Sequence, residues 1–273
     1  MKFKYLIIVF TVLIVIIILI TALFPLIIGG PDFAAEFKVF SLPLLIFMII
    51  LLGGIGTVLL FNYRLFSLLE REDWPALAYY LEQKIYVKGR YSSRYVRLLA
   101  SSYLVITDFQ SVLKLESKAQ LAKPSVINKN VLLFGAARIL NKNHAEAAAF
   151  FNSHMHKAKK EQWVRWFYAF SQLLAGSFSI AEPEFSSLAV SSKSALITGL
   201  SAYFLHDPVA KYSTDSEKCQ KTAILGKNRV IKSHKNFTGW KKEVERSSAN
   251  IHIAIIRKYI DETGNWIFGV KGS

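Results

Sequence analysis

Residues 93–118 read SRYVRLLASSYLVITDFQSVLKLESK, and the same kinds of residue return twice more at steps of about 34 positions. Counting from Ser93, Asn128 and Gln162, the eighth and twentieth slots hold small or slim residues: Ala100, Gly135, Ala169 and Val112, Ala147, Ala181. The seventh and twenty-fourth slots hold bulky apolar residues in most copies: Leu99, Phe134, Tyr168 and Glu116, Phe151, Phe185. Small residues set against large ones at this period predict antiparallel helix pairs stacked as a solenoid.

Turn residues recur with the same period and predict where each helix pair bends. They stand at Asp73, Asp108, Asn143 and Ser177. Side-chain oxygens at such positions can accept the free N–H groups that open a helix. We therefore expect helices over 75–87, 94–106, 109–118, 126–140, 144–155, 161–175 and 178–190, with Gly89 ending the first and Ser92 or Ser93 capping the second.

Two uncharged apolar runs precede the repeats. Tyr5 to Ile28 and Val39 to Phe61 are each long enough to cross a bilayer core of about 30 Å. We expect a transmembrane hairpin with spans at about 5–28 and 39–61, joined by a loop that contains Asp32, Glu36 and Lys38. A cleaved signal peptide is the alternative for the first run, but the apolar part of a signal peptide is usually about 7–15 residues, which is shorter than this run. Gly53, Gly54 and Gly56 suggest a close contact between the two spans.

Charge orients this hairpin. Lys2, Lys4, Arg64 and Arg71 flank the spans and outweigh Lys38 in the loop, so both termini should face the cytoplasm. The chain carries 34 Lys and Arg against 19 Asp and Glu, a net charge of +15, nearly all of it after the second span. Cys219 is the one cysteine, which excludes an internal disulfide and fits a reducing compartment.

The repeat pattern decays after Ser194. A helix is expected to end near His206–Pro208, and the polar, basic stretch 211–245 has Gly226 and Gly239 as expected breaks. Apolar residues over 251–260 are spaced like one face of a final helix, although Ile251 and Ile253 keep a strand possible. We favour a capping helix, because the open end of a solenoid must be covered.

The slots resemble those of the tetratricopeptide repeat (TPR) family. Leu99, Ala100, Tyr103, Ala119 and Pro124 follow the family pattern in one copy, Gly135, Ala147 and Phe151 in the next, and Ala169, Gly176, Ala181 and Phe185 in a third. The family's frequent tryptophan at the fourth slot is absent, and Pro183 inside a second helix departs from the pattern. The likeness covers roughly residues 60–205 and leaves related helical-hairpin solenoids open. Two amino-terminal spans before repeats are also similar to HemY-type membrane proteins, in architecture alone.

The resemblance implies a groove lined by the first helix of each pair. The family's ligand-facing slots fall on Arg94, Arg97, Ser101, Leu104, Lys129, Leu132, Ala136, Ile139, Trp163, Trp166, Phe170 and Leu173. Such a groove is basic at one end and aromatic at the other, and suits a protein segment that carries carboxylates beside an apolar anchor. The alternative is that Trp163, Trp166 and Phe170 pack in the core or against the carboxy-terminal cap.

A second basic surface is expected behind the repeats. Residues 227–246 are rich in Lys and Arg with aromatic residues between them, and the expected contacts with anionic lipid are Lys232, Lys235, Trp240, Lys241 and Lys242. Nucleic acid competes as a partner for these charges, and a solvated loop is the remaining alternative.

Motifs for catalysis or metal binding are not found in the sequence. His154 and His156 are two apart and point away from each other on a helix, and His206-Asp207 has no accompanying cluster. Ile224–Asn228 lacks the first glycine and the hydroxyl residue of a phosphate-binding loop. We therefore expect no enzyme, no cofactor and no metal, although a site assembled from distant residues could escape this reasoning.

The sequence thus predicts an all-α protein with a transmembrane hairpin (1–62), TPR-like repeats (63–205) and a basic carboxy-terminal region with a capping helix (206–273). The predicted function is a protein-docking scaffold at a bacterial inner membrane, facing the cytoplasm. Anionic-lipid or nucleic-acid binding by the carboxy-terminal region, or a membrane-bound enzyme, is the alternative.

Overall fold

Helices form the regular structure throughout the described chain. The computed structural model describes the backbone of residues 3–158, 160–248 and 250–270, and their side chains except for 3–7, 22, 24–26, 28–41, 45 and 60. No β-strand occurs within these residues, so the all-α expectation is confirmed. The chain divides into two compact units, Met1–Tyr80 and Leu81–Ser273.

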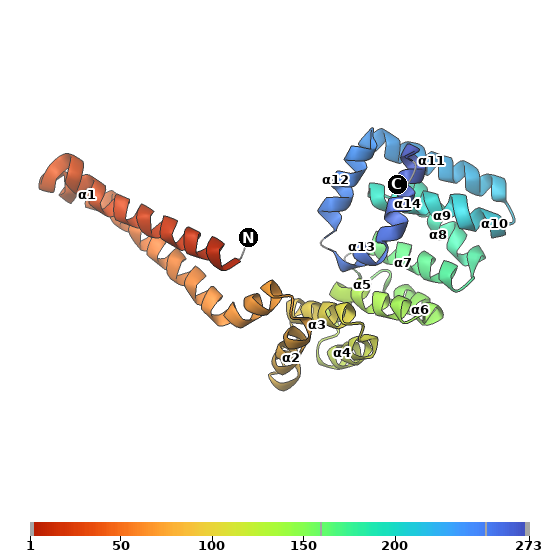
Figure 1. Cartoon of the computed structure of the whole chain (residues 1–273), viewed down its shortest axis with the longest axis horizontal. Helices are drawn as coiled ribbons and strands as arrows, with labels where there is room; N and C mark the ends of the chain where they lie inside the picture. Colours follow the sequence, from red (N-terminus) through yellow and green to blue (C-terminus); the bar gives the residue numbers. More distant parts are fainter. Residues whose placement is uncertain (1–2, 159, 249, 271–273) are drawn as a thin grey trace. The chain divides into compact units, whose positions relative to one another are not determined.

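The first unit contains α1 (Phe3–Glu70) and most of α2 (Trp74–Glu82). In Figure 1, α1 turns back on itself and its second half returns beside its first. Within the described residues, Leu42–Leu59 is long and apolar enough to cross a membrane, with a mean hydropathy of 2.6 and none of it buried. Ile8–Thr21 is a shorter apolar stretch. The backbone of Asp32, Glu36 and Lys38, expected in a loop, lies within α1, and the side chains of these residues and of Lys2 and Lys4 lie outside the described part.

The glycines of α1 do not make the contact that the sequence suggested. A Cβ atom built on Gly53, Gly54 or Gly56 meets no described atom within 4 Å. Gly53 and Gly54 are exposed and Gly56 is half-buried, so among the described residues the expected close contact does not form at these glycines.

The second unit begins with helix pairs. A π-helical segment, Gln83–Val87, follows α2. The pairs are then α3 (Ser93–Val105) with α4 (Phe109–Ala122), α5 (Ser125–Leu140) with α6 (His144–His154), and α7 (Glu161–Leu174) with α8 (Phe178–Ser191). Each helix packs against the next, and the first helices α3, α5 and α7 also contact one another in order (Figure 1).

Four turns of one kind join α1 to α2 and the two helices of each of the three pairs. The residue before each predicted turn residue has a left-handed backbone: Glu72 (φ 54°), Thr107 (φ 59°), Lys142 (φ 61°) and Gly176 (φ 79°). The next N–H donates five residues back, from Asp73 to Leu68 O, Asp108 to Tyr103 O, Asn143 to Arg138 O and Ser177 to Gln172 O, at 2.8–3.2 Å. These bonds satisfy carbonyl groups that the end of a helix leaves free. Asp73 and Asp108 also cap the following helices, accepting from the N–H groups of Ala76 and Ser111 at 3.1 Å.

The carboxy-terminal helices pack back onto these pairs. They are α9 (Ala195–Phe204), α10 (Ala210–Tyr212), α11 (Ser216–His234), α12 (Phe237–Ser247), α13 (Ile251–Ile255) and α14 (Arg257–Phe268), with an irregular segment Leu205–Val209 after α9. Helix α9 contacts α8, α11 and α14, and α13 contacts α5. The expected final helix is present over residues 251–268, apart from a break at Ile256, and no strand forms there.

Gly226 does not interrupt a helix, contrary to expectation. It lies within α11, and a Cβ built on it would stand 2.8 Å from the Cβ of Ala202 and 3.3 Å from that of Ala189. The glycine therefore lets α11 approach α9 and α8 closely, because a larger residue would collide with both. Gly239 lies near the start of α12, where its N–H donates to the Asn236 cap at 2.9 Å.

Candidate partner-binding site

The aromatic end of the predicted groove is part of the core. Trp166 is 0% exposed and Phe170 is 3% exposed, and Trp163 is half-buried. On α5, the predicted ligand-facing residues Leu132, Ala136 and Ile139 are also buried. The prediction that Trp166 and Phe170 meet a partner was therefore wrong, and the alternative of core packing describes them.

The chain's own carboxy-terminal helices cover this aromatic end. The Trp166 ring is stacked on Phe170, with centroids 5.1 Å apart, and contacts Phe204 of α9 at 5.8 Å. Tyr259 of α14 lies edge-on to Phe170 at 5.4 Å. Large aromatic side chains gain most when water is excluded from both faces, which explains why three helices converge here.

His252 of α13 completes the cover. Its ring is buried edge-on against Trp163 at 5.3 Å and Phe167 at 6.3 Å. Burial, reinforced by the nearby charge of Lys160, lowers the pKa of His252 to about 3. The imidazole is therefore neutral near pH 7 and acts as an apolar ring in this packing.

The basic end of the predicted groove remains open. Arg94, Arg97 and Lys129 are exposed, and among the described residues none of the three lies within 4.0 Å of a carboxylate. Asn130 beside Lys129 donates to the Ser93 hydroxyl at 3.2 Å, and this bond ties the start of α5 to the start of α3. The cations of α3 and α5 therefore lie on either side of a contact between the two helices that this hydrogen bond holds in place.

Lys160 brings a fourth cation to this region from the start of α7. Loss of surrounding water, and then the charge of Arg97, lower the pKa of the Lys160 ammonium. Its Nζ donates to Asn250 Oδ1 at 3.3 Å, just before α13. We call Arg94, Arg97, Lys129 and Lys160 the basic cluster. Like charges held together repel one another, so an anion that binds among them gains from each.

A shallow pocket lies at the start of α3. It has a volume of about 550 Å³ and is lined by Gly89, Arg90, Tyr91, Ser92, Tyr95, Ala122 and Lys123. Arg90 and Lys123 add positive charge, and the two tyrosines add apolar surface. This pocket could not be predicted from the sequence, because its lining comes from two segments that only the packing of α3 on α4 brings together.

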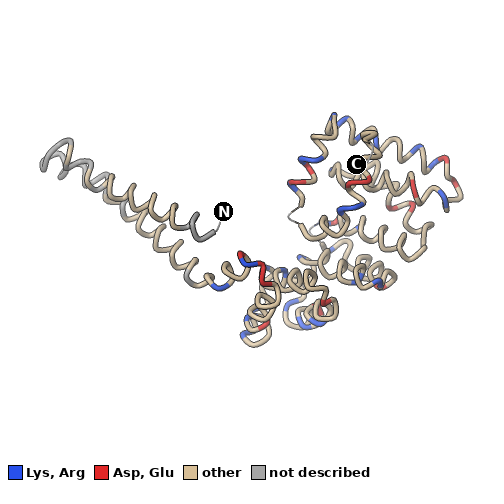
Figure 2. The backbone as a smooth tube through the Cα atoms, in the orientation of Figure 1, with Lys and Arg blue, Asp and Glu red and all other residues tan. Residues whose placement is uncertain are grey.

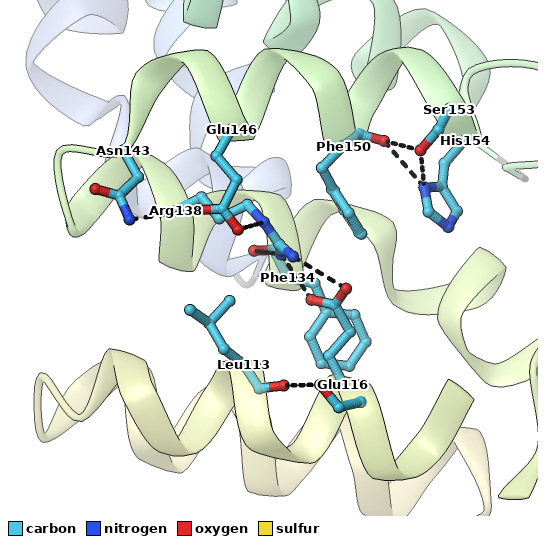
Figure 3. A network of polar contacts seen from close by, with 10 residues as sticks. Leu113, Glu116, Phe134, Arg138, Asn143, Glu146, Phe150, Ser153 and His154 are labelled. Atoms are coloured by element: carbon cyan, nitrogen blue, oxygen red, sulfur yellow. Dashed lines mark hydrogen bonds and ion pairs between the residues drawn. The ribbon is translucent and has the colours of Figure 1, made fainter. Parts of the chain in front are cut away.

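A polar network also escaped the sequence analysis (Figure 3). Arg138 of α5 donates to both carboxylate oxygens of Glu116 on α4, at 2.6 and 3.1 Å, and to Glu146 on α6 at 3.3 Å. Its guanidinium lies 4.3 Å from the centre of the Phe150 ring. Glu116 occupies the slot where the next two repeats have phenylalanine, and this departure was the available signal. The network joins two successive helix pairs and is structural.

The predicted lipid contacts separate into two groups. Lys232, Lys235, Lys241 and Lys242 are exposed. Trp240 is 1% exposed and packs beside Gly264 and Gly199, where a Cβ would stand 2.6 and 3.0 Å from its ring. Trp240 therefore cannot insert into a bilayer, and that part of the prediction was wrong. Within the described part of the chain, no three His, Cys, Asp or Glu side chains gather as they would around a metal.

Comparison with known proteins places the chain in a family. The sequence model of the family described as "Uncharacterised Treponema protein" matches residues 111–269. The chain belongs to this family. The matched region runs from α4 to α14, so the carboxy-terminal helices belong to the same family unit as the helix pairs.

A curated relative extends the likeness toward the amino terminus. A protein of Treponema pallidum (strain Nichols), described as an uncharacterized protein, is 26% identical over 241 residues, covering 85% of this chain and 76% of that protein. Few residues follow 269, so this alignment includes residues before 111. The likeness therefore reaches helices that precede the family match.

Proposed function

We propose that this chain is a membrane-anchored docking protein whose basic cluster binds an acidic segment of a partner protein. The observation that carries the proposal is the gathering of Arg94, Arg97, Lys129 and Lys160 near the starts of three first helices, where no described carboxylate pairs with them. Helix starts also carry partial positive charge, which adds to the attraction for anions. The fitting partner is a peptide segment with two or more carboxylates.

The helix pairs are proposed to be a TPR-like solenoid. The four turns of one kind support a common repeat unit, and so do the small and large residues that recur at fixed positions of each repeat. The burial of Ala100, Gly135 and Ala169 at the eighth slot supports the same assignment. Repeats of this kind present surface to partners, so we propose no enzymatic activity and no cofactor.

The anchor is proposed to be a two-helix transmembrane hairpin formed by α1. Leu42–Leu59 has the length and composition of a span, and none of its described residues is buried. Ile8–Thr21 supplies the described part of the other span. Arg64 and Arg71 follow the second span, which supports a cytoplasmic location for the helix pairs at a bacterial inner membrane.

The docking proposal is tested by paired charge reversals. A photo-crosslinking residue at Ser101, on α3, first identifies the protein bound in cells. The affinity of the purified full-length chain for that protein is then compared between Arg94→Glu/Arg97→Glu and Lys114→Glu/Lys193→Glu. Both variants change the net charge equally, and Lys114 and Lys193 are exposed outside the basic cluster.

The two double variants should differ strongly in their affinity for the partner. We expect the first pair to weaken binding by roughly tenfold or more per residue, as charged contacts in an interface do, and the second to leave it unchanged. Equal losses in both pairs would mean that net charge alone attracts the partner. Crosslinking of Ser101 to nucleic acid in place of protein would also count against the proposal.

A further inference from the structure

The outer face of α11 differs from the other exposed surfaces of the second unit. Its inner face is buried through Cys219, Ala223, Gly226 and Val230. Its outer face carries two exposed aliphatic side chains, Ile224 (53% exposed) and Leu225 (57%). These two side chains are neighbours on the helix, whereas exposed aliphatic residues such as Leu121 and Val190 stand singly in the second unit.

The five cations of α11 have two roles. Lys227 donates to the Trp266 carbonyl at 2.8 Å, and Arg229 donates to the carbonyls of Ala189 and Ser192 at 2.8 and 2.9 Å. These two hold α11 to the fold. The remaining three, Lys218, Lys221 and Lys232, are exposed and are available to a partner.

These three lysines and the two aliphatic residues form one stripe. At 100° per residue, positions 218, 221, 224, 225 and 232 fall on the side opposite the buried residues. From Lys218 to Lys232 the stripe is about 21 Å long. Lys221 forms an ion pair with Glu217 at 2.6 Å, and both side chains are largely exposed, so water screens this pair. Figure 2 shows the Lys and Arg positions along α11 and on into α12.

We propose that this α11 stripe, Lys218, Lys221, Ile224, Leu225 and Lys232, lies on the anionic surface of the membrane that α1 is proposed to cross. Protein interfaces are depleted in lysine and enriched in tryptophan, tyrosine and arginine, and none of those three residues is in the stripe. Lysines around exposed aliphatic residues match a negatively charged headgroup layer over an apolar interior. The anchor keeps the stripe near a bilayer, so weak contacts suffice. The inference rests on the proposed membrane anchor.

A nitroxide at Leu225→Cys, in a Cys219→Ala background, tests the contact. The full-length chain is placed in lipid nanodiscs with and without phosphatidylglycerol, and collisions of the label with oxygen and with a water-soluble nickel chelate are compared. In anionic discs we expect fewer nickel and more oxygen collisions than in neutral discs. At about 1 M salt, where charges are screened beyond about 3 Å, the label should return to water.

Matched variants make the test specific. A label at Leu121→Cys, on an exposed aliphatic residue of α4, should stay in water in both discs. Neutralising Lys218, Lys221 and Lys232 to glutamine should weaken the contact about a hundredfold, from about fivefold per lysine. Neutralising Lys114, Lys157 and Lys193, which are exposed elsewhere, should leave the contact in place.

The failures are distinguishable. A chain that does not remain with the discs overturns the membrane anchor and this inference with it. A chain that remains with the discs while the label at 225 stays in water overturns the inference alone. Equal protection of the label in neutral and anionic discs also overturns it, because that result indicates packing of α11 on protein.

Discussion

Replacing Gly135 by alanine tests whether the small slot of the repeat is required by packing. Gly135 lies in α5 directly beneath the ring of Phe151 on α6. A Cβ at this position would stand 2.0 Å from Cζ and 2.4 Å from Cε1 of that ring. Ordinary contact begins near 3.4 Å, so the ring would have to retreat by about 1.4 Å.

The ring has little room to retreat. Phe151 is 0% exposed and is stacked on Phe167 of α7, with centroids 5.7 Å apart. Overpacking of this kind costs about 1–3 kcal/mol or somewhat more, and we take the upper end because the ring is enclosed. Alanine in place of glycine returns about 1 kcal/mol of helix propensity. We expect Gly135→Ala to lower the free energy of unfolding by about 2 kcal/mol.

A double-mutant cycle isolates this contact. Phe151→Leu removes the ring and should cost about 1–2 kcal/mol by itself. In that background the added methyl group has space, so Gly135→Ala should cost nothing or stabilise by up to about 1 kcal/mol. Urea unfolding of the detergent-solubilised chain, followed by tryptophan fluorescence, measures each free energy. A cost for Gly135→Ala that is equal in both backgrounds would refute the packing argument.

Two further predictions concern buried polar groups. The unfolded chain binds a proton at His252 below about pH 6.5, whereas the folded chain, with a pKa of about 3, does not. The free energy of unfolding should therefore fall by about 2 kcal/mol between pH 6.5 and 5. Urea titrations at each pH measure this fall, which should disappear in His252→Phe. A fall of the same size in His252→Phe would contradict the burial of His252. Glu116→Ala leaves Arg138 half-buried without its main partner and should cost about 2–3 kcal/mol, whereas Glu116→Leu with Arg138→Met should be close to neutral. Thermal melts of these variants measure the difference, and a double variant as unstable as Glu116→Ala would show that the ion pair itself is required.

Local chemistry made several elements predictable from the sequence. Asp73 and Asp108 cap their helices because a short carboxylate next to a helix start can reach the free N–H groups, whatever the rest of the fold. The basic character of Arg94, Arg97 and Lys129 could also be predicted, because charged side chains seldom enter a core unpaired.

Packing decided the features that the sequence analysis assigned wrongly. Gly226 suggested a helix break because glycine is flexible, but the close approach of Ala202 shows that its small size matters. The exposure of Ile224 and Leu225 could not be predicted either, since periodicity alone does not show which apolar residues a neighbouring helix will cover.

The sequence by itself therefore determined the helices of the three pairs, their turns, the apolar composition of α1 and the positive charge at the starts of α3 and α5. Only the tertiary structure decided that Trp166, Phe170 and Trp240 belong to the core. The physical reason is that an apolar helix face must be covered, but its own sequence does not specify by what. Here the cover is α13 and α14, distant in sequence, which bring His252 and Tyr259 onto the aromatic end and leave the basic cluster open.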